Sequence, residues 1–153
     1  MKIEWKKLIL CISLPLAVEG LAGVLTRGGM ETFQTLNKPM LTPPGWLFPI
    51  VWTILYILMG SASYFVLISG KLNRSALVIY GIQLVLNCFW SIIFFNLKAY
   101  LFAFIWLVIL WFFILVTMIL FFKISKFAGY LLVPYLLWVT FAGYLNFSIY
   151  LLN

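Results

Sequence analysis

The amino-acid sequence predicts an all-α membrane protein, a bundle of five transmembrane helices. The chain has 153 residues, of which 66% are hydrophobic and only 8% charged, and its mean hydropathy is +1.17. A soluble domain is about half apolar and about a quarter charged, so a soluble fold of this composition would expose a large apolar surface. The apolar residues also fall into runs of about 20 residues, the length that a helix needs to cross a bilayer.

Short polar or charged breaks separate the apolar runs. The first run, at about 8–26, is long for the hydrophobic core of a signal peptide, and further runs follow it, so we interpret it as a transmembrane helix. The longest break, at about 27–45, has the sequence RGGMETFQTLNKPMLTPPG, and long connections in compact proteins are often functional. In a single domain spanning 1–153, we predict helices at about 8–26, 46–69, 75–97, 101–122 and 127–152.

The Lys and Arg residues predict how the bundle is oriented. One end is expected to collect Lys2, Lys6, Lys7, Lys71, Arg74, Lys123 and Lys126. The other end is expected to have only Arg27, Lys38 and Lys98. Because such residues in short loops stay on the cytoplasmic side, we expect a cytoplasmic N-terminus, with the C-terminus and the 27–45 connection outside. Because these cations are scattered over helix ends, they do not form a surface for nucleic acid. We expect the protein to contact membrane lipid instead.

The residue inventory argues against several kinds of chemistry. The chain has no His and no Asp, which removes the usual zinc ligands, a Ser-His-Asp triad and a His ligand for haem iron. Cys11 and Cys88 both lie inside apolar runs, where a free Cys behaves as a small hydrophobic residue. We therefore predict no metal site and no required cofactor.

Three of the predicted helices have polar and aromatic residues on one face. In helix 75–97, Gln83, Asn87 and Ser91 recur at every fourth position, with Trp90 and Phe94 beside them. Comparable faces of helices 46–69 and 127–152 contain Trp52, Tyr56, Gly60 and Ser63, and Tyr135, Trp138, Ala142 and Asn146. Because amides in hydrocarbon need partners, these faces should point inward. They either bond neighbouring helices together or line a pocket, and spacing alone leaves both open.

The two remaining helices differ from these three. Helix 101–122 is nearly free of polar side chains, so we interpret it as scaffold that faces lipid. Helix 8–26 contains Glu19, the single acid predicted within a span. An intramembrane carboxylate is a candidate functional residue, and pairing with Arg27 or extension to the interface would explain it equally well.

Segment 36–60, LNKPMLTPPGWLFPIVWTILYILMG, resembles the signature of the TspO/MBR family, the tryptophan-rich sensory or translocator proteins. The segments QLVLNCFWSIIFF at 83–95 and LLVPYLLWVTFAGYLNFSIYLLN at 131–153 resemble the third and fifth helices of that family. The number and order of the spans agree, so the resemblance covers nearly the whole chain and implies a bacterial member of the family.

The resemblance implies a bundle, often a homodimer, whose outer pocket is capped by the first loop and binds tetrapyrroles such as protoporphyrin IX and haem. By motif, its pocket residues would be Pro43, Pro44, Trp52, Tyr56, Asn87, Trp90, Trp138 and Ala142. The polar faces add Gln83 and Asn146 as ligand-binding residues, and Lys38 or Arg27 could neutralise propionates.

The sequence also departs from the family pattern. Thr32 and Leu41 stand where the family often has Trp, and Phe33 stands for an aromatic residue that is often hydroxylated. In eukaryotic relatives the resemblance implies cholesterol and benzodiazepine-type ligands. The C-terminal sterol motif needs a basic residue after its Tyr, and none follows Tyr144 or Tyr150, so we do not expect cholesterol recognition through it.

Three functions are compatible with these patterns. The first is a receptor or carrier in a bacterial cell membrane that binds porphyrins for transport, sensing or stress response. The second is an enzyme for light-dependent porphyrin degradation, in which Trp52 and Trp138 would supply oxidisable indoles. The third is a structural membrane subunit without a ligand. Because no acid–base pair or metal cluster supports ordinary turnover, we favour binding.

Overall fold

The computed structural model describes residues 2–71 and 73–153, and this part of the chain folds into helices with no strand. The helices long and apolar enough to cross a membrane number five, which confirms the predicted all-α, five-helix class. They are α1 (Trp5–Leu25), α3 (Leu47–Ile68), α4 (Arg74–Ser91) with its continuation η1 (Ile92–Asn96), α5 (Tyr100–Ile124) and α6 (Lys126–Leu152). The predicted break at 70–74 includes Leu72, which lies outside the described residues.

Two features differ from the simple spans that the sequence predicts. The connection at 27–45 contains a short helix, α2 (Gly29–Thr35), which follows Gly28 in the left-handed region at φ 81°. The third span ends in the π-helical turn η1, where the Leu97 N–H donates to the Ile92 carbonyl at 3.1 Å. The wider turn matters because π-helical turns often occur at functional sites.

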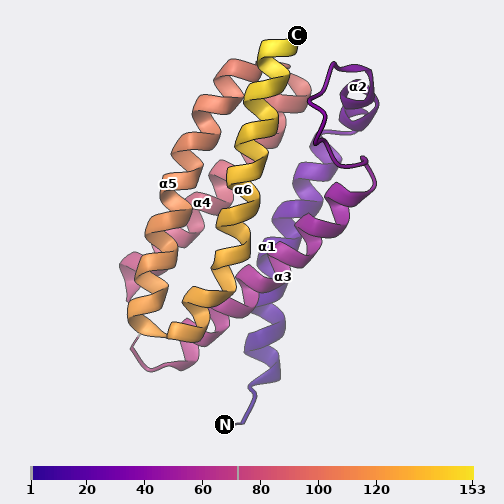
Figure 1. Cartoon of the computed structure of the whole chain (residues 1–153). Coiled ribbons are helices and arrows are strands. Elements are labelled where there is room, and N and C mark those ends of the chain that lie inside the picture. The colour runs from indigo at the N-terminus through magenta and orange to yellow at the C-terminus, as the bar shows by residue number, and fades with distance from the viewer. Residues whose placement is uncertain (1, 72) are drawn as a thin grey trace.

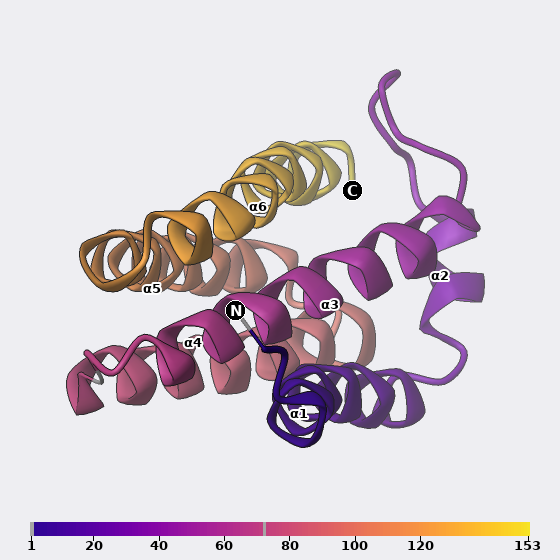
Figure 2. The ribbon, with the colours of Figure 1, turned by 90° about the horizontal axis from the view of Figure 1, so that it is seen from below.

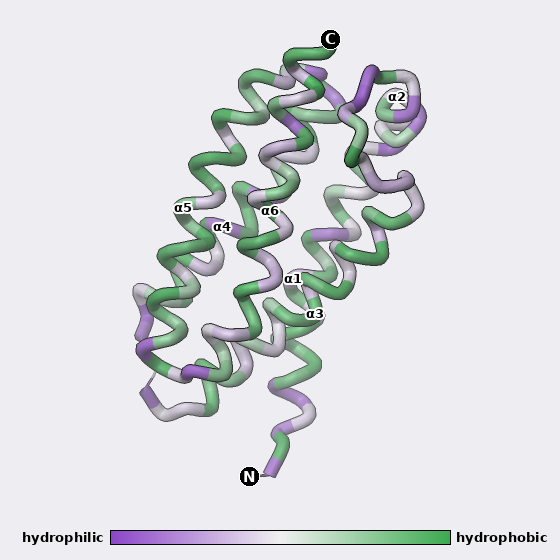
Figure 3. Tube along the Cα trace, viewed as in Figure 1, coloured by the Kyte–Doolittle hydropathy of each residue, from purple (hydrophilic) through white to green (hydrophobic). Residues whose placement is uncertain are grey.

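The spans pack as two helix pairs, α1 with α3 and α5 with α6 (Figures 1 and 2). Contacts of α3 with α6 join the pairs, and α4 packs against α5. The C-terminus and α2 lie at one end of the bundle, and the N-terminus lies at the other (Figure 1). The helices consist of hydrophobic residues along most of their length, and hydrophilic residues gather near the bundle ends and around α2 (Figure 3).

Gly60 permits a close crossing between α1 and α3. A Cβ atom at this position would lie 2.5 Å from the Ile12 Cα and 2.6 Å from the Cys11 carbonyl oxygen. Both contacts are with backbone atoms, which cannot rotate away as a side chain can. In the membrane, close backbone approach at small residues is a main source of helix association.

Gly60→Ala should therefore destabilise the protein by about 2 kcal/mol, the usual size of an overpacking penalty. The measurement is the midpoint of thermal unfolding in detergent. Gly81→Ala in α4 is the matched control, because a Cβ there meets no atom within 4 Å. Since Ala is the better helix former, this control should leave the midpoint unchanged or raise it. Equal losses in both variants would contradict a special constraint at Gly60.

Candidate ligand-binding site

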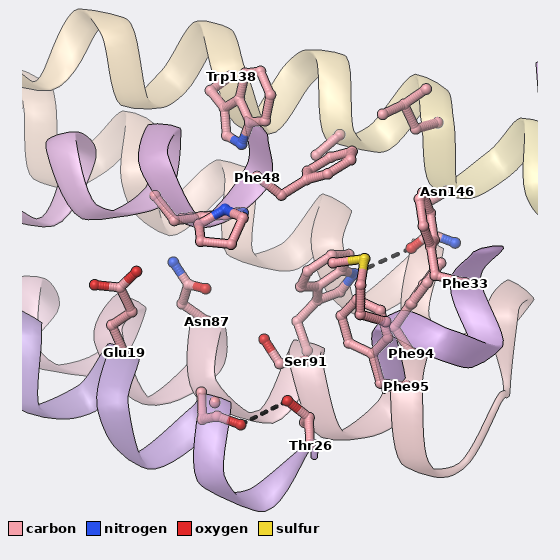
Figure 4. Close-up of a pocket in the computed structure, with 18 of the residues that line it drawn as sticks. Glu19, Thr26, Phe33, Phe48, Asn87, Ser91, Phe94, Phe95, Trp138 and Asn146 are labelled. Atoms are coloured by element: carbon pink, nitrogen blue, oxygen red, sulfur yellow. Dashed lines mark hydrogen bonds between the residues drawn. The ribbon is translucent and has the colours of Figure 1, made fainter. Parts of the chain in front are cut away.

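A cavity opens between α1, α3, α4 and α6 at the end of the bundle that carries α2 (Figure 4). The cavity has a volume of about 230 Å³ and an open mouth at this end of the bundle. α5 contributes none of the lining residues. The cavity therefore belongs to the helices with polar faces, together with α1 and the turn η1.

The cavity wall collects seven of the side chains that the sequence analysis selected for ligand binding. They come from α3, α4 and α6: Trp52, Tyr56, Asn87, Trp90, Trp138, Ala142 and Asn146. Four others, Lys38, Pro43, Pro44 and Gln83, do not line this cavity.

Aromatic rings form much of the wall. Trp52 stacks on Tyr56 with ring centroids 5.7 Å apart and lies 6.5 Å from Trp90. Phe48 makes edge contacts with Trp138 at 5.9 Å and with Phe33 of α2 at 5.5 Å. Flat aromatic faces suit a flat apolar guest, because stacking adds to the gain from burying the surface.

A chain of hydrogen bonds lies behind this wall. The Asn87 amide donates to the Tyr135 hydroxyl at 2.7 Å, and that hydroxyl donates to Gln83 Oε1 at 2.7 Å. The Gln83 amide in turn contacts the Met59 sulfur at 3.7 Å. Gln83 lies one helical turn deeper than Asn87, where Tyr135 separates it from the cavity, so it positions a wall residue instead of lining the wall.

Asn146 plays two parts at once. Its Oδ1 accepts from the Trp90 indole N–H at 3.1 Å (Figure 4), and its Nδ2 donates to the Tyr100 carbonyl at 2.8 Å. The residue thus joins α6 to α4 and α5 while one side lines the cavity. The spacing left two interpretations open, a bond between helices or a pocket wall. Asn146 does both.

Trp138 presents a donor that the described chain does not satisfy. Its indole Nε1 is buried and has no hydrogen-bond partner among the described residues, and Figure 4 shows it turned toward the cavity. Buried N–H groups are nearly always paired, so this unpaired donor beside the cavity would gain a partner if a small shift of the wall let a ligand acceptor reach it.

Glu19 lies on the α1 side of the cavity, half-buried. Its carboxylate accepts from the Thr53 hydroxyl at 3.1 Å, and no ion pair with Arg27 occurs in the part of the chain that the structure describes. Glu19 therefore pairs with Thr53 and not with Arg27.

The short helix α2 roofs the cavity through Met30 and Phe33. Lys38, expected to meet ligand propionates, donates instead to the Phe33 and Gln34 carbonyls at 2.9 and 3.1 Å. The orphan carbonyls at the end of a helix attract a cation, which explains this position. Together with Pro43 and Pro44, Lys38 lines a separate groove in the connection.

Contacts at both ends hold the roof in place. Gly29 packs on Phe95 of η1, where a Cβ would come within 2.7 Å of the Phe95 Cβ. Beyond α2, the Asn37 N–H donates to Asn153 Oδ1 at 3.2 Å, and Asn153 Nδ2 donates to the Asn37 carbonyl at 2.9 Å. The first connection is thereby tied to η1 and to the last turn of α6.

Part of the lining was not predicted from the sequence. Phe48 lies one turn before Trp52 on the same face of α3, so its helical spacing could have identified it. Ala22 and Gly23 of α1 and the C-cap residue Thr26 also line the cavity, and no polar periodicity marks them in the sequence. Among the described residues, no group of three or more His, Cys, Asp or Glu side chains could hold a metal ion.

Tyr135→Phe should lower stability by about 1 to 2 kcal/mol, because it leaves the Asn87 donor and the Gln83 acceptor unpaired in an apolar interior. The midpoint of thermal unfolding in detergent measures the effect. Tyr130→Phe makes the same chemical change on the same helix, where the side chain is 63% exposed, and should have little effect. A Tyr135→Phe protein as stable as this control would contradict the proposed importance of the network.

Comparison with known proteins adds independent information on this chain. A family model described as the TspO/MBR family matches residues 11–152. The chain is 49% identical to the "Tryptophan-rich protein TspO" of Chlorobaculum tepidum over 95% of each chain. It is 42% identical to the "Tryptophan-rich sensory protein" of Cereibacter sphaeroides, over 80% of this chain and 77% of that protein. It is also 33% identical to the "Translocator protein" of Homo sapiens, over 80% and 75% respectively.

Proposed function

The chain belongs to the TspO/MBR family of membrane proteins, and from this premise we propose that it is a receptor or carrier that binds porphyrins and related flat apolar molecules. The proposed site is the cavity between α1, α3, α4 and α6. The observation that carries the proposal is the unpaired Trp138 N–H on a wall of aromatic rings.

The chemistry of the wall supports a flat aromatic guest such as a tetrapyrrole. Trp52, Tyr56 and Trp90 form one cluster of rings, and Phe48 and Trp138 form a second. Stacking and burial would provide most of the affinity, and the few polar groups would set the orientation.

The roof suits a site that must admit a guest of this size. α2 meets the bundle through Phe33 and Gly29, and the connection after it is fastened by Asn37 and Asn153. Because few side chains hold the roof, its opening is a small local rearrangement compared with separating the long helices. We therefore propose entry beside α2.

The biological setting is proposed on charge and family grounds. Seven cations, from Lys2 to Lys126, are placed at the end opposite α2, which favours a cytoplasmic N-terminus and an outward-facing cavity in a bacterial cell membrane. Transport, sensing and stress response all require such a site. A homodimer, implied by the family resemblance, stays a prediction.

Titration of the detergent-solubilised protein with protoporphyrin IX should quench tryptophan fluorescence saturably. Trp138→Phe should weaken binding about five- to tenfold, because it removes one buried hydrogen bond to the ligand. Trp5→Phe is the matched control, since Trp5 is 63% exposed at the far end of α1. Its affinity should equal that of the unchanged protein.

The contradicting outcome is equally concrete. Quenching that does not saturate, or that matches an unrelated membrane protein of similar tryptophan content, would remove the binding proposal and favour a structural subunit. Equal affinity in Trp138→Phe and Trp5→Phe would place the porphyrin elsewhere.

A second candidate function is light-dependent porphyrin degradation, favoured by the Trp52 and Trp138 indoles, which both line the cavity. Illumination of the protein–porphyrin complex in air should then bleach the porphyrin absorption bands. The double variant Trp52→Phe/Trp138→Phe, at porphyrin concentrations that restore full occupancy, should slow bleaching at least about tenfold if the indoles supply the reacting electrons. Bleaching at an unchanged rate would leave binding as the function.

A further inference from the structure

We propose that Glu19 sets the charge preference of this cavity, so that ligands presenting an N–H or cationic group toward α1 bind better than ligands presenting carboxylates. The inference rests on the proposed binding function and names the ligand class within it. It concerns the α1 side of the site, which the family motifs quoted above do not include.

The position of Glu19 leaves part of its carboxylate free. The Thr53 hydroxyl lies 3.1 and 3.4 Å from the two carboxylate oxygens and 2.7 Å from the Pro49 carbonyl oxygen. A hydroxyl has one hydrogen, so this donor is shared and most acceptor sites of Glu19 stay open. In Figure 4 the Glu19 carboxylate lies on the same side of the cavity as Asn87.

The charge inventory of the wall is one-sided. Glu19 is the single acidic side chain among the cavity-lining residues, and none of those residues is Lys or Arg. Lys38 is occupied at the end of α2, and Arg27 is exposed in the turn that precedes it. Among the described side chains around the cavity, no cation offsets the carboxylate.

An uncompensated carboxylate in apolar surroundings favours a ligand that donates to it. A pyrrole N–H, an amine or another cation would supply the missing partner, and a ligand carboxylate at the same place would be repelled. A porphyrin with propionates is then expected to bind with these groups turned toward the mouth and away from α1. Aromatic ring faces also attract cations, so the contribution of Glu19 is the part of the preference that changes when its charge is removed.

The competing interpretation is that Glu19 only ties α1 to α3 through Thr53. A tie would contribute to stability without discriminating between ligands of one shape and different charge. The two interpretations therefore separate in a comparison of ligands that share a macrocycle.

The experiment uses three such ligands with the full chain in neutral detergent: protoporphyrin IX, its dimethyl ester, and its bis-amide with dimethylaminoethyl arms. The expected order of affinity is cationic amide, then ester, then free acid. Glu19→Gln keeps the size of the side chain and its contact with Thr53 but removes the charge. It should raise the affinity for the acid relative to the uncharged ester about tenfold, as expected for one pair of unit charges about 10 Å apart at an effective dielectric of about 20.

Two further variants keep the result interpretable. Glu31→Gln makes the same charge change on the exposed surface of α2 and should leave the order unchanged. Gly23→Lys adds a cation one turn along α1 on the cavity wall, where a Cβ meets no atom within 4 Å, and should shift the preference toward the acid.

The outcomes distinguish the inference from the function on which it rests. If no porphyrin binds saturably, the proposed function fails. If all three bind and their affinity ratios are the same in the unchanged protein and in Glu19→Gln, the role of Glu19 is overturned while the binding site stands. A shift in Gly23→Lys alone would show only that the cavity senses an added charge. A Thr53→Val protein, which keeps the charge, should retain the original order; loss of the order in this variant would contradict a preference set by the Glu19 charge alone.

Discussion

Polar side chains buried in hydrocarbon must find their partners inside the bundle, and much of this structure follows from how three amides do so. Gln83 and Asn87 share Tyr135, and Asn146 links Trp90 to the Tyr100 carbonyl. Each of these bonds crosses from one helix to another, so the amides fix how α4, α5 and α6 face one another. They also orient the indole of Trp90 and the amide of Asn87 on the cavity wall, which makes the site a consequence of the same bonds that hold the helices together.

The roof depends on that framework and adds little stability of its own. α2 is seven residues long, too short to form a stable helix alone. It rests on Phe95 of η1 through Gly29 and inserts Phe33 beside Phe48, while Lys38 satisfies its last carbonyls. Because the roof makes no bond to Gln83, Asn87 or Asn146, it can move without disturbing the amide network, which would widen the mouth of the cavity for an entering ligand.

Apolar run length and polar periodicity predict most of the fold and about half of the wall. The run lengths identify the five spans, and the repeats through Asn87 and Trp138 identify the faces that turn inward. Helix periodicity could not show that Asn87 lines the cavity and Gln83 does not, since both lie on one face of α4. Both bond to the Tyr135 hydroxyl, but only Asn87 borders the open space. The position of Lys38 was equally hidden, because its partners are backbone carbonyls of a short helix that the loop composition did not predict.

Residue size along α3 explains why the bundle is hollow at one end and closed at the other. Near its start, Phe48, Trp52 and Tyr56 extend toward α4 and α6 and border open space. One turn beyond Tyr56, Gly60 has no side chain, and α1 comes into backbone contact there. Away from that crossing, α1 borders the cavity at Glu19, where Thr53 donates to it across the gap between the helices. An intramembrane carboxylate is thus placed where the helices are no longer in backbone contact, and where a bound guest would be its nearest new partner.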